Sequence, residues 1–307
     1  MTSMKERATV IVNPAAGANR THRRWPGIKR LIERTGLSFD SRLTEERGHA
    51  IELARTAVND GCRYLVAVGG DGTVHEVANG LLQPPYSDKI ALGIVCTGTG
   101  SDLSRSVGTP RHYAQACSVL TSTGRRAIDV GLIDYQKGGQ SLRRYFLNAA
   151  GIGFDAAVVE ATERMPKYFG GTIPYLVGLA RSMLSYRNKT VDFEIGGGAP
   201  ERAKVLGMVM ANGGYFGGGM FIAPEARLDD GLLDVVIVGD FGKLELAKVF
   251  PRIYKGTHLR YPKVRLERDS LVRIASPQRF LVHADGELLG EGPVSLGILP
   301  HAIQLVV

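Results

Sequence analysis

The chain contains 307 residues, 44% of them hydrophobic, and its mean hydropathy is −0.02. This composition supplies enough apolar side chains for a sizeable core and excludes a disordered chain, while the length favours two domains. The net charge of +8 favours an acidic partner, such as a nucleotide or an anionic membrane surface. We expect no nucleic-acid partner, because the basic residues are dispersed and no helix-turn-helix, zinc or aromatic RNA-binding pattern occurs.

The cysteines and the N-terminus favour a cytoplasmic protein. Cys62, Cys96 and Cys117 form no CxxC pair, which indicates reduced thiols rather than a disulfide scaffold or a zinc site. The first seven residues are polar and lack the pattern of a signal peptide, and no apolar run approaches the ~18–20 residues that span a bilayer. We therefore expect a soluble, cytoplasmic protein whose positive charge brings it to the inner face of the membrane as a peripheral protein.

Strand and helix patterns alternate through the first third of the chain. The predicted strands are residues 8–12, 38–43, 64–68 and 90–95. The predicted helices are residues 23–35, 49–60, 74–82 and 111–121. Apolar strands that alternate with helices indicate a parallel sheet covered on both faces, so we predict a three-layer, doubly wound α/β domain over residues 1–125.

From about Arg126 the pattern becomes rich in strands. The predicted strands are residues 126–134, 142–150, 190–195, 203–212, 233–238, 263–268, 271–275, 279–284 and 294–306. The predicted helices are residues 156–163, 173–186 and 244–255. Many strands at short spacing favour an antiparallel β-sandwich, which we assign to residues 126–307, with the return of the last strands to the first domain left open.

The most informative segment is Gly69-Gly70-Asp71-Gly72-Thr73, between a buried strand and an amphipathic helix. A glycine turn at the start of a helix lets backbone N–H groups approach a phosphate with no Cβ in the way. Because a carboxylate at that place would repel a phosphate unless it handles a proton or a metal, Asp71 favours phosphoryl chemistry over simple binding. An ordinary strand-to-helix turn is the alternative that this segment leaves open.

Residues 69–73, followed by the pattern ending in Glu76-Val77-Ala78-Asn79-Gly80, resemble the nucleotide-binding signature of the diacylglycerol kinase catalytic domain family. That family includes bacterial lipid kinases and the sphingosine and ceramide kinases. NAD kinases share the pentapeptide and phosphofructokinases carry a variant, so the motif alone indicates a superfamily and no substrate. The family usually has asparagine where this chain has Ser101, and often has asparagine where it has His75. Both replacements keep a hydrogen-bonding side chain.

The resemblance extends to loops that follow the other strands of the first domain. Asn13-Pro14-Ala15-Ala16-Gly17 follows the first strand, Thr44 follows the second, and a loop containing Thr99 follows the fourth. In an open α/β sheet, ligands collect beyond the carboxyl ends of the strands. The resemblance implies that ATP binds across residues 70–76, including Glu76, and Thr99, with Thr44 and the 13–17 loop closing the site. Read alone, the 13–17 loop is a common turn and Thr44 a helix cap.

Three segments of the second domain resemble the same family. Residues 148–155 match its N-x-x-G-x-G-x-D pattern and residues 212–219 its N-x-x-x-x-G-G-G pattern. In residues 224–234, an acidic turn enters a strand, an arrangement that can present oxygens to a hard ion such as Mg²⁺. The resemblance places Asp230 as the side-chain ligand, with the carbonyls of Arg227 and Leu232 completing the site. A hairpin turn without a metal is the alternative.

The last segment is Asp285-Gly286-Glu287, after a predicted strand. The resemblance makes Glu287 the proton acceptor, while Asp71 organises the catalytic network or the metal. Read alone, such a segment is usually a solvated turn. Its assignment as a catalytic segment depends on the five motifs of this chain occurring in the same order as in the family. Whether Glu287 or Asp71 accepts the proton stays open.

These features favour an ATP- and Mg²⁺-dependent lipid kinase that transfers the γ-phosphoryl group of ATP to a hydroxyl of diacylglycerol or a similar lipid, as in phospholipid biosynthesis. The alternatives are a small-metabolite kinase of the NAD kinase type and a catalytically silent lipid- or nucleotide-binding regulator. The sequence leaves open the lipid, the oligomeric state (including a homodimer), and whether the apolar residues 165–186 contact a membrane or belong to the core.

Overall fold

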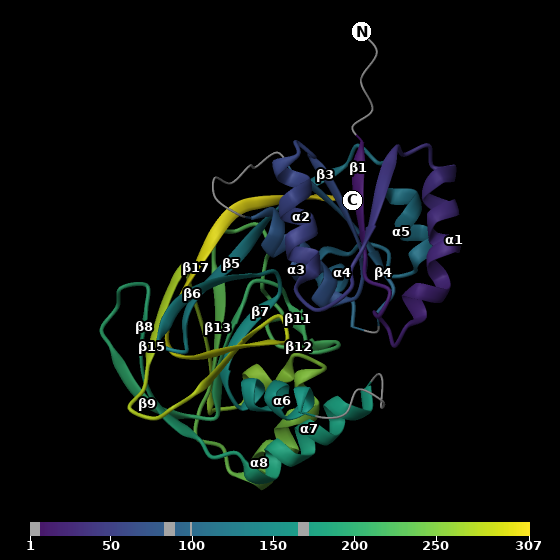
Figure 1. Cartoon of the computed structure of the whole chain (residues 1–307). Coiled ribbons are helices and arrows are strands. Elements are labelled where there is room, and N and C mark those ends of the chain that lie inside the picture. The colour runs from purple at the N-terminus through teal and green to yellow at the C-terminus, as the bar shows by residue number, and fades with distance from the viewer. Residues whose placement is uncertain (1–6, 83–89, 99, 165–171) are drawn as a thin grey trace. The chain divides into compact units, whose positions relative to one another are not determined.

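The computed structural model describes residues 7–82, 90–98, 100–164 and 172–307 (Figure 1). The chain divides into two compact units. Unit 1 comprises Met1–Asp129 and Pro300–Val307, and unit 2 comprises Val130–Leu299. Strands β5 (Arg125–Lys137) and β17 (Glu287–Val306) each contribute residues to both units. Within the described ranges, no helix is both long and apolar enough to cross a membrane.

Unit 1 is built on a parallel sheet in the order β4-β3-β1-β2. Its strands are β1 (Ala8–Val12), β2 (Phe39–Leu43), β3 (Tyr64–Gly69) and β4 (Ala91–Cys96). The end of β17 joins the β4 edge in parallel, where Gln304 lies opposite Ala91. Every residue of β1 and β3 is buried, as expected for strands covered on both faces.

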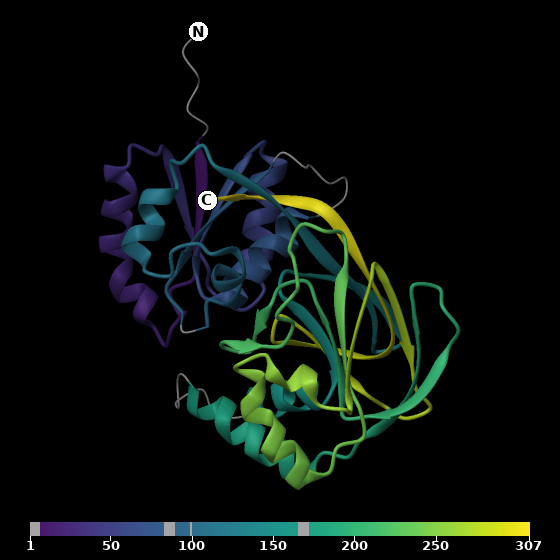
Figure 2. The same ribbon diagram turned by 180° about the vertical axis from the view of Figure 1, so that it is seen from behind.

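Helices cover both faces of this sheet (Figures 1 and 2). The faces are covered by α1 (Arg20–Arg34) with α5 (Tyr113–Val119), and by α2 (His49–Asn59) with α3 (Asp71–Leu81). Ile28 and Ile32 of α1 pack into the core against the strands. Gly80 lets α2 and α3 approach closely, since a Cβ there would lie 2.6 Å from the Cβ of Ala54. The predicted three-layer parallel-sheet domain is therefore confirmed.

Unit 2 is an antiparallel sandwich. Besides parts of β5 and β17, its strands are β6 (Gln140–Phe146), β7 (Ala149–Gly153), β8 (Lys189–Ile195), β9 (Glu201–Val205), β10 (Gly207–Ala211), β13 (Leu233–Val238), β14 (Val264–Asp269), β15 (Leu271–Ala275) and β16 (Leu281–Ala284). Two arms, β14-β13-β10-β7-β16 and β9-β8-β15, both pair with β17. Side chains from both arms, such as Met208 and Val235 from the first and Val191 and Ile274 from the second, share one buried core. The predicted sandwich is confirmed.

Helices α6 (Phe154–Glu163), α7 (Thr172–Ser185) and α8 (Lys243–Ile253) group together on unit 2 (Figures 1 and 2). Phe154 and Leu246 pack with the strand residues Val209 and Val236 in a second core. A short hairpin of β11 (Tyr215–Phe216) and β12 (Met220–Phe221), which the sequence pattern does not predict, adds Phe216 to the border of that core.

The apolar segment at residues 165–186 is described only in part, because residues 165–171 lie outside the described ranges and the side chains of residues 172–176 are also outside them. Further along α7, Leu179 is buried in the core and Met183 packs against it. Val177 and Leu184 are exposed. The later part of α7 therefore presents one apolar face to the core of unit 2 and leaves two apolar side chains outside it.

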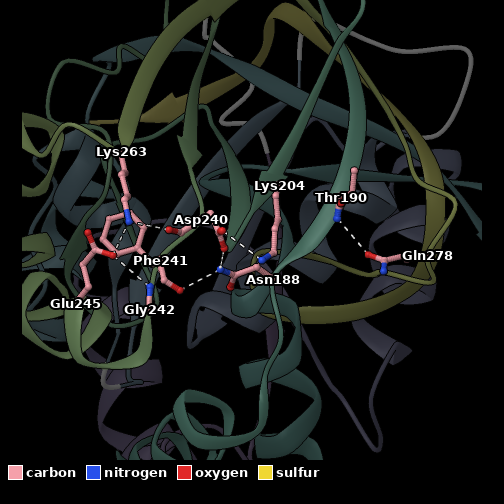
Figure 3. Close-up of polar contacts among 9 residues, drawn as sticks. All are labelled: Asn188, Thr190, Lys204, Asp240, Phe241, Gly242, Glu245, Lys263 and Gln278. Atoms are coloured by element: carbon pink, nitrogen blue, oxygen red, sulfur yellow. Dashed lines mark hydrogen bonds and ion pairs between the residues drawn. The ribbon is translucent and has the colours of Figure 1, made fainter.

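A polar network fixes the start of α8 (Figure 3). Asp240 accepts hydrogen bonds from Asn188 at 2.5 Å and from Lys204 at 3.2 Å. Lys263 donates to the Asp240 carbonyl and to Glu245, whose carboxylate also caps the helix by accepting the Gly242 N–H. The hydrogen bond from Lys263 lowers the pKa of Glu245. These groups are largely exposed, so the network serves to order the loop before α8 more than to add stability.

Candidate functional site

The predicted nucleotide-binding segments of unit 1 meet at one edge of its sheet. Because β1 to β4 run parallel, the loops that follow them leave from the same edge. Asn13 follows β1, Thr44 follows β2, Gly70 follows β3 and Thr97 follows β4. The backbone connects neighbouring loops, since Thr44 donates its N–H to the Val12 carbonyl at 2.9 Å and Thr97 donates to the Gly69 carbonyl at 2.8 Å.

The glycine turn opens directly into α3. The helix begins at Asp71 rather than at the predicted residue 74, so Gly72 and Thr73 belong to its first turn. The N–H groups of Thr73 and Val74 bond to the Gly70 carbonyl, and a Cβ placed on Gly72 would meet no atom within 4 Å. The start of a helix carries partial positive charge and N–H groups without helical partners. Open space at Gly72 in front of such groups suits a phosphate.

Two other loops pack tightly against this turn. A Cβ on Gly98 would lie 2.8 Å from the Gly70 Cα, so these two glycines put one backbone directly against the other. Asn13 donates through Nδ2 to Thr73 Oγ1 at 3.0 Å. Gly17 has a φ of +63°, and a Cβ there would lie 2.8 Å from the Thr97 carbonyl. The glycines are therefore needed for loop packing as well as for any ligand.

Pro14 and Thr44, two further predicted contacts of the nucleotide, take part in backbone hydrogen bonds. The Pro14 carbonyl accepts the His22 N–H at 3.1 Å, which connects the loop to the first turn of α1. Thr44 is buried. Thr99, the remaining predicted contact in the loop after β4, lies outside the described residues.

Asp71 connects the turn to the loop after β4. Its Oδ1 accepts the Asp102 N–H at 2.8 Å, at the first residue of α4 (Asp102–Val107), and a Cβ on Gly100 would run into its carboxylate. Ser101 between them has a φ of 56°, a conformation that asparagine adopts more readily than serine. Asp71 thus accepts a backbone N–H at the start of α4 and holds the loop after β4.

Glu76 and His75 lie further along α3. Glu76 accepts the Ala50 N–H at 3.3 Å, in the first turn of α2, where a carboxylate is favourable. His75 is buried, with an exposed fraction of 3%. Both residues therefore have a structural place in unit 1, and Glu76 connects α3 to α2 rather than to the loops after β1 and β4.

The predicted functional segments of unit 2 lie along one edge of its sheet. The antiparallel register sets this arrangement, because it puts the starts of β13 and β7 beside the ends of β10 and β16. The hairpin from β16 to β17 ends at the same edge. In strand order the residues at this edge are Asp230, Asn212, Asn148, Asp285 and Glu287.

The two acidic residues of the 285–287 segment have different partners. Asp285 accepts the backbone N–H groups of Leu147, Asn148 and Ala149 at 2.7 to 3.0 Å, so its carboxylate fixes the chain before β7. Glu287 accepts hydrogen bonds from the Arg144 guanidinium, the shortest being 2.6 Å. Glu287 is thus the first residue of β17 in an ion pair rather than a freely solvated turn residue.

The acidic turn before β13 has oxygen donors of the kind that a hard ion prefers. Asp230 accepts the Leu232 N–H through Oδ1 at 3.1 Å, and the predicted partners at Arg227 and Leu232 are backbone carbonyls. Among the described residues, no group of three or more His, Cys, Asp or Glu side chains could hold a metal. This donor set fits a cation that keeps several waters, as Mg²⁺ does.

The turn is well separated from Glu287 along the edge. Four strand spacings lie between β13 and β17, which is roughly 19 Å at about 4.8 Å per spacing. An ion at Asp230 would therefore order the acidic turn and would not touch Glu287. The next carboxylate, Asp234, is buried against Arg268 at 2.9 Å, and burial raises its pKa in spite of that partner.

One pair that the sequence reasoning missed lies on the helix-covered face of unit 2. His283 has an exposed fraction of 1%, and its Nε2 lies 2.9 Å from Asp155 Oδ2. Its Nδ1 has no hydrogen-bond partner among the described residues. Gly151 makes room for the pair, since a Cβ there would lie 2.7 Å from the His283 Nε2 and would collide with the Asp155 carboxylate. The available signal was a histidine two residues before Asp285.

Two family models match the chain. Residues 7–133 match the diacylglycerol kinase catalytic domain, and residues 148–307 match the YegS C-terminal NAD kinase beta sandwich-like domain. The diacylglycerol kinase of Staphylococcus carnosus (strain TM300) is 28% identical over 302 residues, which cover 98% of this chain and 95% of the relative. The diacylglycerol kinase of Staphylococcus aureus (strain MRSA252) is 29% identical over 304 residues, which cover 98% and 92%.

Solved structures show the same fold. A Bacillus anthracis (strain Sterne) protein provisionally named diacylglycerol kinase aligns over 100% of this chain and 97% of its own, with a TM-score of 0.80 at 25% identity. Yeast NADH kinase in complex with NADH aligns over 99% and 84%, with a TM-score of 0.55 at 12% identity, and shares the fold alone. The YegS C-terminal model spans more than half of the chain, and the diacylglycerol kinase model matches the α/β part of unit 1. The protein is therefore a kinase that belongs to the diacylglycerol kinase catalytic domain family, with a YegS-type C-terminal domain.

Proposed function

We propose that this protein is an ATP-dependent lipid kinase, a phosphotransferase that moves the γ-phosphoryl group of ATP to a hydroxyl of diacylglycerol or a similar lipid. The observation that carries the proposal is the start of α3, where a Cβ on Gly72 would meet no atom within 4 Å at the positive end of the helix and loops from β1 and β4 flank the turn. The names of the relatives, which span nearly the whole chain, support diacylglycerol as the acceptor.

Phosphoryl transfer depends mainly on positioning and on neutralising the phosphate charge. We assign the phosphates of ATP to the first turn of α3, with Asn13, Gly17 and Thr44 around the nucleotide. Asp71 holds the loop after β4 in place through Asp102. Mg²⁺, when bound, supplies positive charge that offsets the phosphate oxygens, and Asp230 with the carbonyls of Arg227 and Leu232 would hold a second, structural ion.

In the reaction, the lipid hydroxyl oxygen forms a bond to the γ-phosphorus while the bond to the β–γ bridging oxygen breaks and ADP leaves. The hydroxyl proton moves to a carboxylate. We assign that role to Glu287, as the resemblance to the family implies, and give Asp71 the role of holding the loop after β4 through the Asp102 N–H. The net charge of +8 supports a peripheral association with anionic lipid, where the acceptor resides.

The test is an acceptor panel. Purified protein is incubated with γ-labelled ATP, Mg²⁺ and mixed micelles that contain diacylglycerol, monoacylglycerol, a sphingoid base or ceramide, with NAD in a separate reaction. The proposal predicts label in one or more of the lipids and none in NAD. Label in NAD alone would indicate a small-metabolite kinase, and nucleotide binding without transfer to any acceptor would indicate a silent regulator.

A further inference from the structure

The Arg144 guanidinium holds the Glu287 carboxylate. Arg144 of β6 donates through Nη2 to both oxygens, at 2.6 Å and 2.8 Å, and through Nε to one of them at 3.2 Å. The exposed fractions of the two side chains are 21% and 22%, so the pair is shielded from most solvent. The planar fork of arginine matches a carboxylate and fixes its orientation as well as its charge.

Arg144 is a cation in direct hydrogen-bond contact with the Glu287 carboxylate. Tyr135 of β5 lies near both groups, and burial raises the pKa of its hydroxyl, which keeps it neutral. Asp285, two residues before Glu287, uses its carboxylate to bind three backbone N–H groups. An opposite charge at hydrogen-bond distance favours the ionised form of a carboxyl group. Arg144 therefore both orients Glu287 and favours its charged state.

A held carboxylate keeps the capacity to receive a proton. Its two oxygens offer about four lone-pair positions, and the Arg144 fork donates to both oxygens. The fork fixes the direction in which both oxygens point. A proton acceptor contributes only when it lies within hydrogen-bond reach of the proton it takes, and misplacement by about 1 Å can lower a rate on the order of 10²-fold.

We propose that Arg144 is a positioning residue for Glu287: its guanidinium holds the carboxylate ionised and in one orientation at the edge of the unit 2 sheet, ready to accept the proton of the lipid hydroxyl. The inference rests on the proposed function, in which Glu287 is the acceptor. It assigns no contact between Arg144 and the lipid. Loss of Arg144 should therefore change the rate and its pH dependence, and leave the nucleotide site of unit 1 as it is.

The chain offers a matched control on the neighbouring residue. Arg143 makes an ion pair with Asp134 at 2.7 Å and 2.8 Å, also in a bidentate arrangement. Successive strand residues point to opposite faces, so Arg143 lies on the other side of β6 from Arg144. Arg143→Gln removes an arginine–carboxylate pair from the same hairpin without touching Glu287.

The kinetic experiment compares Arg144→Gln, Arg144→Lys and Arg143→Gln with the wild type. We expect Arg144→Gln to lower kcat on the order of 10²-fold, with the KM for ATP little changed. The acidic limb of its pH–rate profile should move to higher pH by about 1–3 units, since a neighbouring cation lowers the pKa of a carboxyl group by about that amount and the variant lacks the cation. Arg144→Lys should recover part of the rate because it keeps the charge and loses the fork. Equal kcat and equal pH profiles in Arg144→Gln and Arg143→Gln would overturn the proposal.

A second measurement does not depend on activity. The carboxyl ¹³C signals of labelled glutamates are followed against pH, and the Glu287 signal is assigned by its loss in Glu287→Gln. The midpoint should rise by about 1–3 pH units in Arg144→Gln and stay unchanged in Arg143→Gln. An unchanged midpoint in Arg144→Gln overturns the proposal. A shifted midpoint in a protein that phosphorylates no lipid supports the hold of Arg144 on Glu287 while the proposed function fails.

Discussion

Substitution of Gly72, in the first turn of α3, should weaken nucleotide binding without lowering the stability of the fold. A Cβ there would meet no atom within 4 Å, and the residue is helical. Alanine is about 1 kcal/mol more favourable than glycine within a helix. Gly72→Ala should therefore leave the free energy of unfolding unchanged or raise it by up to about 1 kcal/mol, although it removes a residue that we place in the binding site.

The same Cβ should weaken ATP binding. In a helix the Cα–Cβ bond tilts toward the N-terminus, so the new methyl group projects into the space where a phosphate oxygen would approach. Loss of one hydrogen bond to a charged group costs about 1.5–3 kcal/mol, which corresponds to roughly a 10- to 100-fold higher Kd. Gly72→Val, with two more methyl groups, should bind more weakly still.

The assay pairs urea unfolding with calorimetric titration of a non-hydrolysable ATP analogue. Gly27→Ala is the control, because Gly27 also lies inside a helix, α1, and a Cβ added there would meet no atom within 4 Å. The control should show the same change in stability and the affinity of the wild type. A folded Gly72→Val protein that binds the analogue as tightly as the wild type would refute the assignment of phosphate to this helix start.

Three further outcomes follow from the structure. Gly151→Ala should lower the free energy of unfolding by about 1–3 kcal/mol through overpacking, because its Cβ would collide with the Asp155–His283 pair; a urea transition equal to that of the wild type would contradict this. Burial lowers the pKa of His258 below its ordinary 6.5, so the unfolded chain binds the proton at a higher pH than the folded one. The free energy of unfolding should therefore fall as the pH drops below about 6.5, by up to ~1.4 kcal/mol per pH unit. His258→Asn should flatten that pH dependence, and equal slopes in the two proteins would exclude His258 as its source. Mg²⁺ should raise the Tm of the wild type and have a smaller effect on Asp230→Asn; equal shifts would place the ion elsewhere.

Much of the fold follows from local patterns. The strands and helices of unit 1 have strong periodicity, and β3 is an unbroken apolar run that ends in glycine. Helix α3 starts at Asp71, three residues before the predicted start at residue 74. Glycine has low helix propensity, so the sequence pattern left Gly72 outside the helix, whereas the structure places it in the first turn. The six residues of α4 are too few to show a helical period.

The contacts that define the candidate site could not be predicted from local sequence patterns. Arg144 and Glu287 are 143 residues apart in sequence, and Asp155 and His283 are 128 apart. No spacing rule connects such residues, since Arg144 lies in β6 and Glu287 begins β17, while Asp155 lies in α6 and His283 in β16. The family pattern marked Glu287 and the sequence between Asn148 and Asp155, but the contacts of these residues with Arg144 and His283 are set by tertiary structure.

The most direct test is transfer of label from γ-labelled ATP to diacylglycerol in mixed micelles, measured for the wild type, Glu287→Gln and Asp71→Asn. We expect labelled lipid with the wild type and a rate about 10²–10⁴-fold lower with Glu287→Gln, at unchanged ATP affinity. Asp71→Asn should lose activity together with nucleotide affinity, because Asp71 holds the loop after β4. Lipid labelling by Glu287→Gln at the wild-type rate would exclude Glu287 as the proton acceptor, and no labelled lipid with the wild type would exclude a diacylglycerol kinase.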